Sequence, residues 1–325
     1  MDDVLIAIRG IHFAATILLA GAIFFQHVVA RPVLRAADAA MVRDWRAQQA
    51  ALMWSALGLA VVSGAAWLVR LAASISDATM SDVLSDGTAW TMLTETQFGM
   101  VWTVRLAGAL ALAVCIPAMA KSESAAPWRW VSVAVTAGIL AAMAWTGHSG
   151  AMSGFAGDMQ LACDVLHLIA AGAWLGGLVP LAQLLGSARR DGDGTPLAIA
   201  ATLRFSLLGM ISVGTLVATG VVNTYILVGS VSALTGTFYG QLLVAKIGLF
   251  TAMLGLAAIN RFILLPRLRQ AGYLRLLQWN SLAEAFLGMI VIAIVAAIGT
   301  MEPAAHDMMD IDALASGGSF FAIMR

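Results

Sequence analysis

The chain has 325 residues, of which 61% are hydrophobic and 11% are charged, and its formal net charge at pH 7 is +0. A mean hydropathy of +0.89 excludes an ordinary soluble domain, and the balanced charge gives no basis for nucleic-acid binding. Apolar runs of about 20 residues recur, each long enough to cross a hydrocarbon core as a helix and too long for a barrel strand. The composition therefore predicts an all-α, polytopic membrane helix bundle.

Eight transmembrane helices are predicted, at roughly 4–30, 47–73, 99–120, 127–147, 159–185, 203–228, 239–263 and 278–301. They form one domain, residues 1–302, followed by a C-terminal tail, residues 303–325. Basic residues concentrate in every second connection: Arg31, Arg35, Arg43, Arg46, Lys121, Arg129, Arg189, Arg190, Arg204, Arg261, Arg267, Arg269 and Arg275. The connections between these contain no Lys or Arg, so the positive-inside rule predicts that both termini lie on the outer side.

The stretch WTGHSGAMSGFAGDMQLACDVLHLIAAGAWLGGLVPL, residues 145–181, ends one predicted span and begins the next. Within it, Asp164 and His167 are three residues apart, and Cys163 and His167 are four apart. On a helix, both spacings place the side chains on one face. Ionisable groups inside an apolar helix are costly unless they face a protein interior, a cavity or an ion. This segment is therefore the leading candidate for a functional site.

Three histidines are predicted to converge in the outer half of the bundle. His12 lies about eight residues into the first span, about 12 Å deep at 1.5 Å per residue, and His167 lies similarly deep in the fifth span. His148, in the loop after the fourth span, is expected above them. A lone membrane histidine is often explained by a hydrogen bond to a neighbour. A matched pair favours shared metal ligation, because imidazole is the commonest metal ligand and sulfur donors favour Cu(I).

The predicted metal ligands are His12, His148, Cys163 and His167, and no catalytic residue is predicted. Asp164 is expected to act from behind the ligands, by orienting His167 or by balancing the charge of a cation. Lys246 is likewise expected behind the ligands and not among them.

Four basic side chains lie near the outer ends of predicted spans: Arg9, Arg70, Arg105 and Lys246. They either extend to the membrane surface or form a buried polar cluster with Asp164, and the sequence leaves both alternatives open.

The tail contains a further group of possible donors, His306, Met308 and Met309. It is either a solvated terminus or a capture arm for external metal.

Other functional classes remain. Paired histidines at matched depth could instead ligate haem iron, in a haem- or quinone-linked redox protein. A membrane scaffold without metal, whose polar residues only pair with one another, is a third alternative. The sequence contains no nucleotide-binding loop, catalytic serine motif or paired-cysteine metal motif. An ATP-driven pump is therefore unsupported, and we expect a protein that is not an enzyme.

Several segments resemble the copper resistance protein D (CopD/PcoD) family: DVLHLIAAGAWLGGLVPL, RFSLLGMISVGTLVATGVVNTYI, YGQLLVAKIGLFTAMLGLAAINRF, the N-terminal RGIHFAATILLAGAIFF and GHSG. The resemblance covers nearly the whole chain and is strongest at residues 145–265. The positions that match are His12, His148, Asp164, His167, Trp174, Tyr239, Lys246 and Asn260.

The resemblance implies a multi-pass protein of the bacterial inner membrane with eight helices, whose termini the positive-inside rule predicts to be periplasmic. Its expected function is copper uptake from the periplasm towards the cytoplasm, with copper ion as the bound metal, and haem remains the alternative that the paired histidines leave open. The expected partners are membrane lipid and a periplasmic copper-binding protein of the CopC-like type, and no nucleic acid. The resemblance does not indicate an oligomeric state.

Overall fold

The structure is a computed structural model, and it describes residues 2–35, 37–121, 126–146, 154–190 and 194–302. Within these residues the chain is helical and contains no strand. The elements are α1 (Asp3–Phe25), η1 (Gln26–Ala30), α2 (Arg31–Leu34), α3 (Ala39–Ser76), α4 (Met80–Ser85), α5 (Thr88–Glu95), α6 (Gln97–Lys121), α7 (Ala126–Ala144), α8 (Gly154–Arg190), α9 (Thr195–Val228), α10 (Val231–Gly236), α11 (Phe238–Ala258), η3 (Ile259–Leu264), η4 (Leu265–Arg267) and α12 (Tyr273–Ile298).

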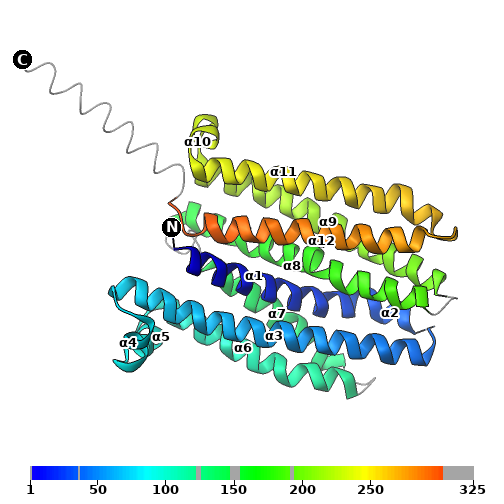
Figure 1. The fold of residues 1–325 in the computed structure, drawn as a ribbon, viewed down its shortest axis with the longest axis horizontal. Coiled ribbons are helices and arrows are strands. Elements are labelled where there is room, and N and C mark those ends of the chain that lie inside the picture. Colours follow the sequence, from blue (N-terminus) through cyan, green and yellow to red (C-terminus); the bar gives the residue numbers. More distant parts are fainter. Residues whose placement is uncertain (1, 36, 122–125, 147–153, 191–193, 303–325) are drawn as a thin grey trace, which may run out of the picture.

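Eight of the described helices are long and apolar enough to cross a membrane, and they lie side by side along the long axis of the molecule (Figure 1). The predicted helical membrane bundle is therefore confirmed. The first span is continuous from Asp3 to Leu34, because η1 is a π-helical segment that joins α1 to α2 without a break.

The two ends of the bundle differ. The N-terminus, the end of α12 and the short helices α4, α5 and α10 lie at one end, which we call the terminal end (Figure 1). The basic connections occur at the opposite end, which we call the loop end. The positive-inside rule predicts that the terminal end faces outwards.

Helices α1 and α8 form the centre of the bundle. Helix α1 packs against α3, α7, α8 and α12, and α8 packs against α9 and α12 as well. A side-chain carbon added at Gly21 would overlap the backbone of Gly176, and one at Gly176 would overlap the carbonyl oxygen of Ile17. Glycine is needed at both positions because the two backbones approach this closely. Gly21 follows His12 by as many residues as Gly176 follows His167, which places the two histidines at similar depth.

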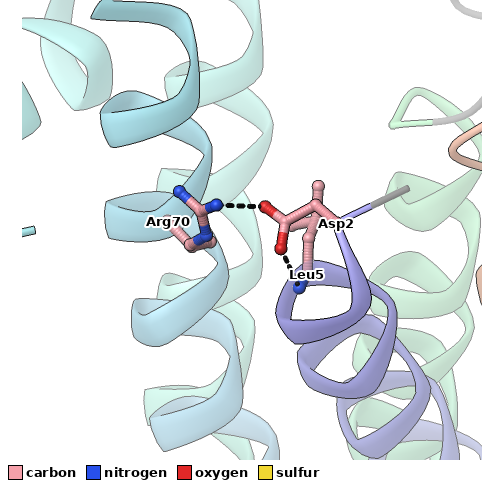
Figure 2. Close-up of polar contacts among 3 residues, drawn as sticks. All are labelled: Asp2, Leu5 and Arg70. Atoms are coloured by element: carbon pink, nitrogen blue, oxygen red, sulfur yellow. Dashed lines mark hydrogen bonds and ion pairs between the residues drawn. The ribbon is translucent and has the colours of Figure 1, made fainter. Parts of the chain in front are cut away.

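Asp2 begins the first helix and also ties it to α3 (Figure 2). One carboxylate oxygen accepts a hydrogen bond from the Leu5 backbone N–H at 3.1 Å, as an N-cap residue does. The other oxygen pairs with Arg70 at 2.5 Å. Arg70 thus has a protein partner at the terminal end.

Candidate metal site

Five of the predicted site residues lie in the described part of the chain: His12, Cys163, Asp164, His167 and Lys246. The others lie outside the described residues: His148, His306, Met308 and Met309.

His12 is buried, with 3% of its surface exposed, and it points towards α3 and α6. Its Nδ1 lies 2.9 Å from the carbonyl oxygen of Ala60. A carbonyl only accepts hydrogen bonds, so Nδ1 carries the proton and donates. The remaining nitrogen, Nε2, accepts a hydrogen bond from Arg105. Both ring nitrogens are therefore engaged, and His12 offers no free lone pair to a metal in this arrangement.

Arginine and tryptophan side chains surround His12. The guanidinium of Arg105 lies 4.2 Å from the ring centre of Trp102, and that of Arg9 lies 4.9 Å from the ring centre of Trp67. Arg9 and Arg105 are 8% and 4% exposed, so they are buried and do not extend to the membrane surface, whereas a cluster that joins them to Asp164 stays a prediction. Such contacts stabilise a cation that has left water. The same positive charge opposes the binding of a metal cation at His12.

His167 differs from His12 in the partner of its Nε2, and it points towards α9. Its Nδ1 lies 2.8 Å from Oγ1 of Thr219, whose hydroxyl donates to the carbonyl oxygen of Thr215 at 2.7 Å. Because the Thr219 proton is used in that bond, Oγ1 accepts from Nδ1–H. Nε2 of His167 therefore carries the lone pair, and no described residue occupies it. This tautomer allows Nε2 to bind a metal, and it is fixed by the hydrogen bond of the other ring nitrogen.

Asp164 lies one turn before His167 in a group of polar side chains. It accepts a hydrogen bond from Nδ2 of Asn223 at 2.5 Å, and its charge acts on Lys246 and Tyr239. Lys246 is also within electrostatic range of His167. Asp164, His167 and Lys246 thus lie in one polar region, but the hydrogen bond that orients His167 comes from Thr219, and the roles of Asp164 and Lys246 at a metal stay predictions.

Sequence reasoning missed the contribution of α9. This membrane-spanning helix carries a polar stripe on one face, formed by three residues at intervals of four: Thr215, Thr219 and Asn223. A search for polar periodicity within the sixth apolar run would have identified this stripe as the partner of the His167 segment.

Cys163 is a free, partly buried thiol one helical turn before His167. Its spacing places it on the same side of α8 as the imidazole. Cysteine sulfur is a soft ligand, and soft ligands favour Cu(I).

The described contacts of His12 and His167 have no residue in common. Among the described residues, no three His, Cys, Asp or Glu side chains are close enough to hold a metal ion together. The sharing of one metal by His12 and His167 therefore stays a prediction. A metal site around His167 likewise stays a prediction, and it would need ligands beyond the described donors.

Comparison with known proteins gives consistent matches along the chain. Residues 1–158 match the family described as copper resistance protein D-like, N-terminal domain, and residues 199–298 match the family described as copper resistance protein D. The chain is 30% identical over 261 residues to copper resistance protein D of Pseudomonas syringae pv. tomato, which covers 75% of this chain and 83% of that protein. It is 31% identical over 303 residues to the inner membrane protein YebZ of Escherichia coli (strain K12), covering 92% and 98%.

A third relative is the copper transport protein CutJ of Bacillus subtilis (strain 168), 33% identical over 233 residues. This match covers 70% of the present chain and 42% of CutJ. No solved structure matches the chain significantly.

Proposed function

Because the chain belongs to the copper resistance protein D family, we propose that this multi-pass inner membrane protein carries copper from the periplasm towards the cytoplasm. Copper is the cargo, and the role is transport rather than catalysis. The proposed direction uses the predicted orientation, in which the His167 region lies in the outer half of the bundle.

The observation that carries the proposal is the state of His167. Its Nδ1–H is held by Thr219, and its Nε2 is unoccupied among the described residues. A histidine held in this way can ligate a cation without first breaking a hydrogen bond. Cys163 supplies a thiol on the same side of α8, and Asp164 offsets the positive charge that copper brings.

Copper reaches this site from the periplasmic face in the proposed pathway. His148 belongs to the connection immediately before α8, so it is assigned to the entrance. A periplasmic copper-binding protein of the CopC-like type delivers the ion, and His306, Met308 and Met309 of the tail raise the local copper concentration.

His12 is proposed as a copper ligand under one condition only. It becomes a copper ligand only in a state in which Arg105 has withdrawn from Nε2. The same contact weighs against the haem alternative, because a pair of axial histidines requires an open nitrogen on each ring. An optical spectrum of the purified protein checks this point, since bound haem would give a Soret band.

The test is copper uptake by purified protein reconstituted into lipid vesicles. Replacing His167 by Ala should abolish uptake, because it removes the open imidazole. His27→Ala is the matched control, since His27 lies near the loop end and bonds Ser132 through Nε2 at 3.2 Å. Wild-type uptake by the His167→Ala protein, or equal loss in both variants, would contradict the proposed site.

A further inference from the structure

Glu284 is a buried carboxyl group that the proposed copper site does not use. It lies near the middle of α12 and is 1% exposed, among the apolar residues of the main core, which include Trp174, Leu178 and Leu277. An ionisable side chain at this depth is costly and marks a functional position by default. The question is which charge state the surroundings of Glu284 support.

Two asparagines build the polar surroundings of this carboxyl. Nδ2 of Asn280 donates to Oδ1 of Asn260 at 2.7 Å and to the carbonyl oxygen of Leu256 at 3.0 Å. These bonds fix the Asn260 amide so that its own Nδ2 donates to Oε2 of Glu284 at 3.3 Å. The side chain that meets the carboxyl is therefore a neutral donor whose orientation is set by a second residue.

The other carboxyl oxygen, Oε1, has no hydrogen-bond partner among the described residues. The indole N–H of Trp174 faces the carboxyl from α8, without making a hydrogen bond of good geometry to Oε1. One buried oxygen is thus left open, which is the position where a proton can be carried.

No described cation balances Glu284. The elements packed against α12 are α1, α8, α11 and η3, and none of them brings a described ionisable side chain into electrostatic contact with this carboxyl. Arg275, the basic residue nearest to Glu284 in sequence, and Arg261, which follows Asn260, make no described contact with the carboxyl. A carboxylate buried without a cation neutralises by taking up a proton. The N–H of Asn260, which donates to the carboxyl, lowers the cost of the ionised form, so both the protonated and the ionised form of Glu284 are accessible.

The backbone beside Glu284 is irregular. Asn260 belongs to the π-helical segment η3, in which the usual helical hydrogen-bond pattern is replaced by a wider turn. Such π-helical turns are frequent at functional sites. The donor to Glu284 therefore comes from a stretch of backbone that departs from regular helix.

Glu284 also lies nearer to the loop end than the proposed copper site does. His167 and Trp174 are two turns apart on one face of α8, and Trp174 faces Glu284. A cation that leaves His167 for the loop end along this face of α8 would pass the level of the carboxyl. The charge on Glu284 then acts directly on the cargo.

We propose that Glu284 is a proton-exchange site that couples proton movement to the passage of copper. The inference rests on the proposed copper transport. As the cation approaches, the O–H bond of the carboxylic acid breaks and its proton leaves to water, and the carboxylate balances the charge of copper. After the cation has left, the carboxylate takes up a proton and the O–H bond forms again.

The test uses vesicles that contain the full-length protein and a pH-sensitive dye. Wild-type protein should move protons when copper is added, and a pH gradient should change its rate of copper uptake. Glu284→Gln should bind copper with unchanged affinity but lose the copper-driven proton movement and the response to the gradient. Ser281→Ala is the matched control, because this buried hydroxyl on the same helix bonds only Leu277 within α12. It should behave as wild type.

The outcomes separate the two proposals. Copper uptake by the wild type without proton movement or gradient response would overturn the coupling and leave copper transport standing. Wild-type proton movement in the Glu284→Gln protein would also overturn it. Absence of wild-type copper uptake would overturn both proposals.

Infrared spectroscopy provides a readout that does not depend on transport. Wild-type protein should show the carbonyl band of a protonated carboxylic acid that is lost in Glu284→Gln and that changes when copper is added. A spectrum without such a band would refute the proton site. Glu284→Asp, which keeps the carboxyl, should retain a shifted band and part of the coupling.

Discussion

Thr219 should control the affinity of the candidate site although it is not itself a ligand. Replacing Thr219 by Val preserves the shape of the side chain and removes the oxygen that accepts from Nδ1–H of His167. The freed imidazole ring can rotate, or its proton can move to Nε2. Either change removes the Nε2 lone pair from the position where it would bind the metal. The substitution therefore acts on the tautomer of His167 without touching the ion.

The size of the effect follows from the lost contact. Thr219 is 5% exposed, so water does not readily replace its hydroxyl. A buried donor left without a partner costs about 1–3 kcal/mol. Changes behind a metal-binding histidine typically lower metal affinity about 10- to 100-fold, or about 1.4–2.8 kcal/mol. We expect Thr219→Val to weaken copper binding by about this factor and to lower the stability of the copper-free protein by no more than the cost of the unpaired donor, about 1–3 kcal/mol.

The assay is competition for copper between the purified protein and a chelator of known affinity. Thr224→Val is the matched control, because the Thr224 hydroxyl bonds only the carbonyl oxygen of Gly220 within α9. Thr219→Ser should restore most of the affinity, since it returns the oxygen. Equal copper affinity in wild type and Thr219→Val would refute the argument that this hydrogen bond prepares His167.

Three further predictions concern packing, the terminal end and the tail. Gly176→Ala should lower the stability measured by thermal unfolding in detergent by about 1–3 kcal/mol, because the added carbon meets backbone atoms. Gly138→Ala is the control and should leave the stability unchanged, because its added carbon meets nothing within 4 Å. Equal stability of the two variants would contradict the close helix approach. Asp2→Asn should lower the free energy of unfolding by about 0–1 kcal/mol, since it removes a partly exposed ion pair with Arg70 but keeps an oxygen that caps the helix. A larger loss of stability in thermal unfolding would show that the ion pair is stronger than its exposure implies. Deleting residues 303–325 should reduce copper uptake mainly at low external copper; loss at every concentration would assign the main site to the tail.

The membrane architecture could be predicted from the sequence because it depends on long apolar runs and on the spacing of basic residues. The close approach at Gly176 could also be anticipated, since small residues inside an apolar helix allow two backbones to meet. The similar depth of His12 and His167 could be predicted too, because the number of residues along a helix converts directly into distance.

The direction in which each side chain points could not be predicted in the same way. His12 and His167 lie at similar depth on adjacent helices, yet His12 turns to Arg105 on α6 and His167 to Thr219 on α9. The helical period fixes which residues share a face, but the rotation of the helix in the bundle decides which neighbours that face meets. The apolar faces of α1 and α8 are too uniform for the sequence to reveal that rotation.

The buried arginines show a second limit. Arg9 and Arg105 near a predicted helix end are equally compatible with extension to the membrane surface or with burial. Burial is possible here because Trp67 and Trp102, from two other helices, offer their ring faces to the guanidinium groups. That compensation depends on tertiary contacts between residues far apart in the sequence.

The most direct test of the account is the coordination of copper in the purified wild-type and His167→Ala proteins. Elemental analysis and copper X-ray absorption spectroscopy would be carried out on both, with His27→Ala as the control. The account predicts that wild type and control bind copper with an imidazole nitrogen among its ligands, and that His167→Ala loses this signal together with most of the bound copper. An unchanged copper content and an unchanged imidazole signal in His167→Ala would contradict the assignment of His167 as the ligand on which the site is built.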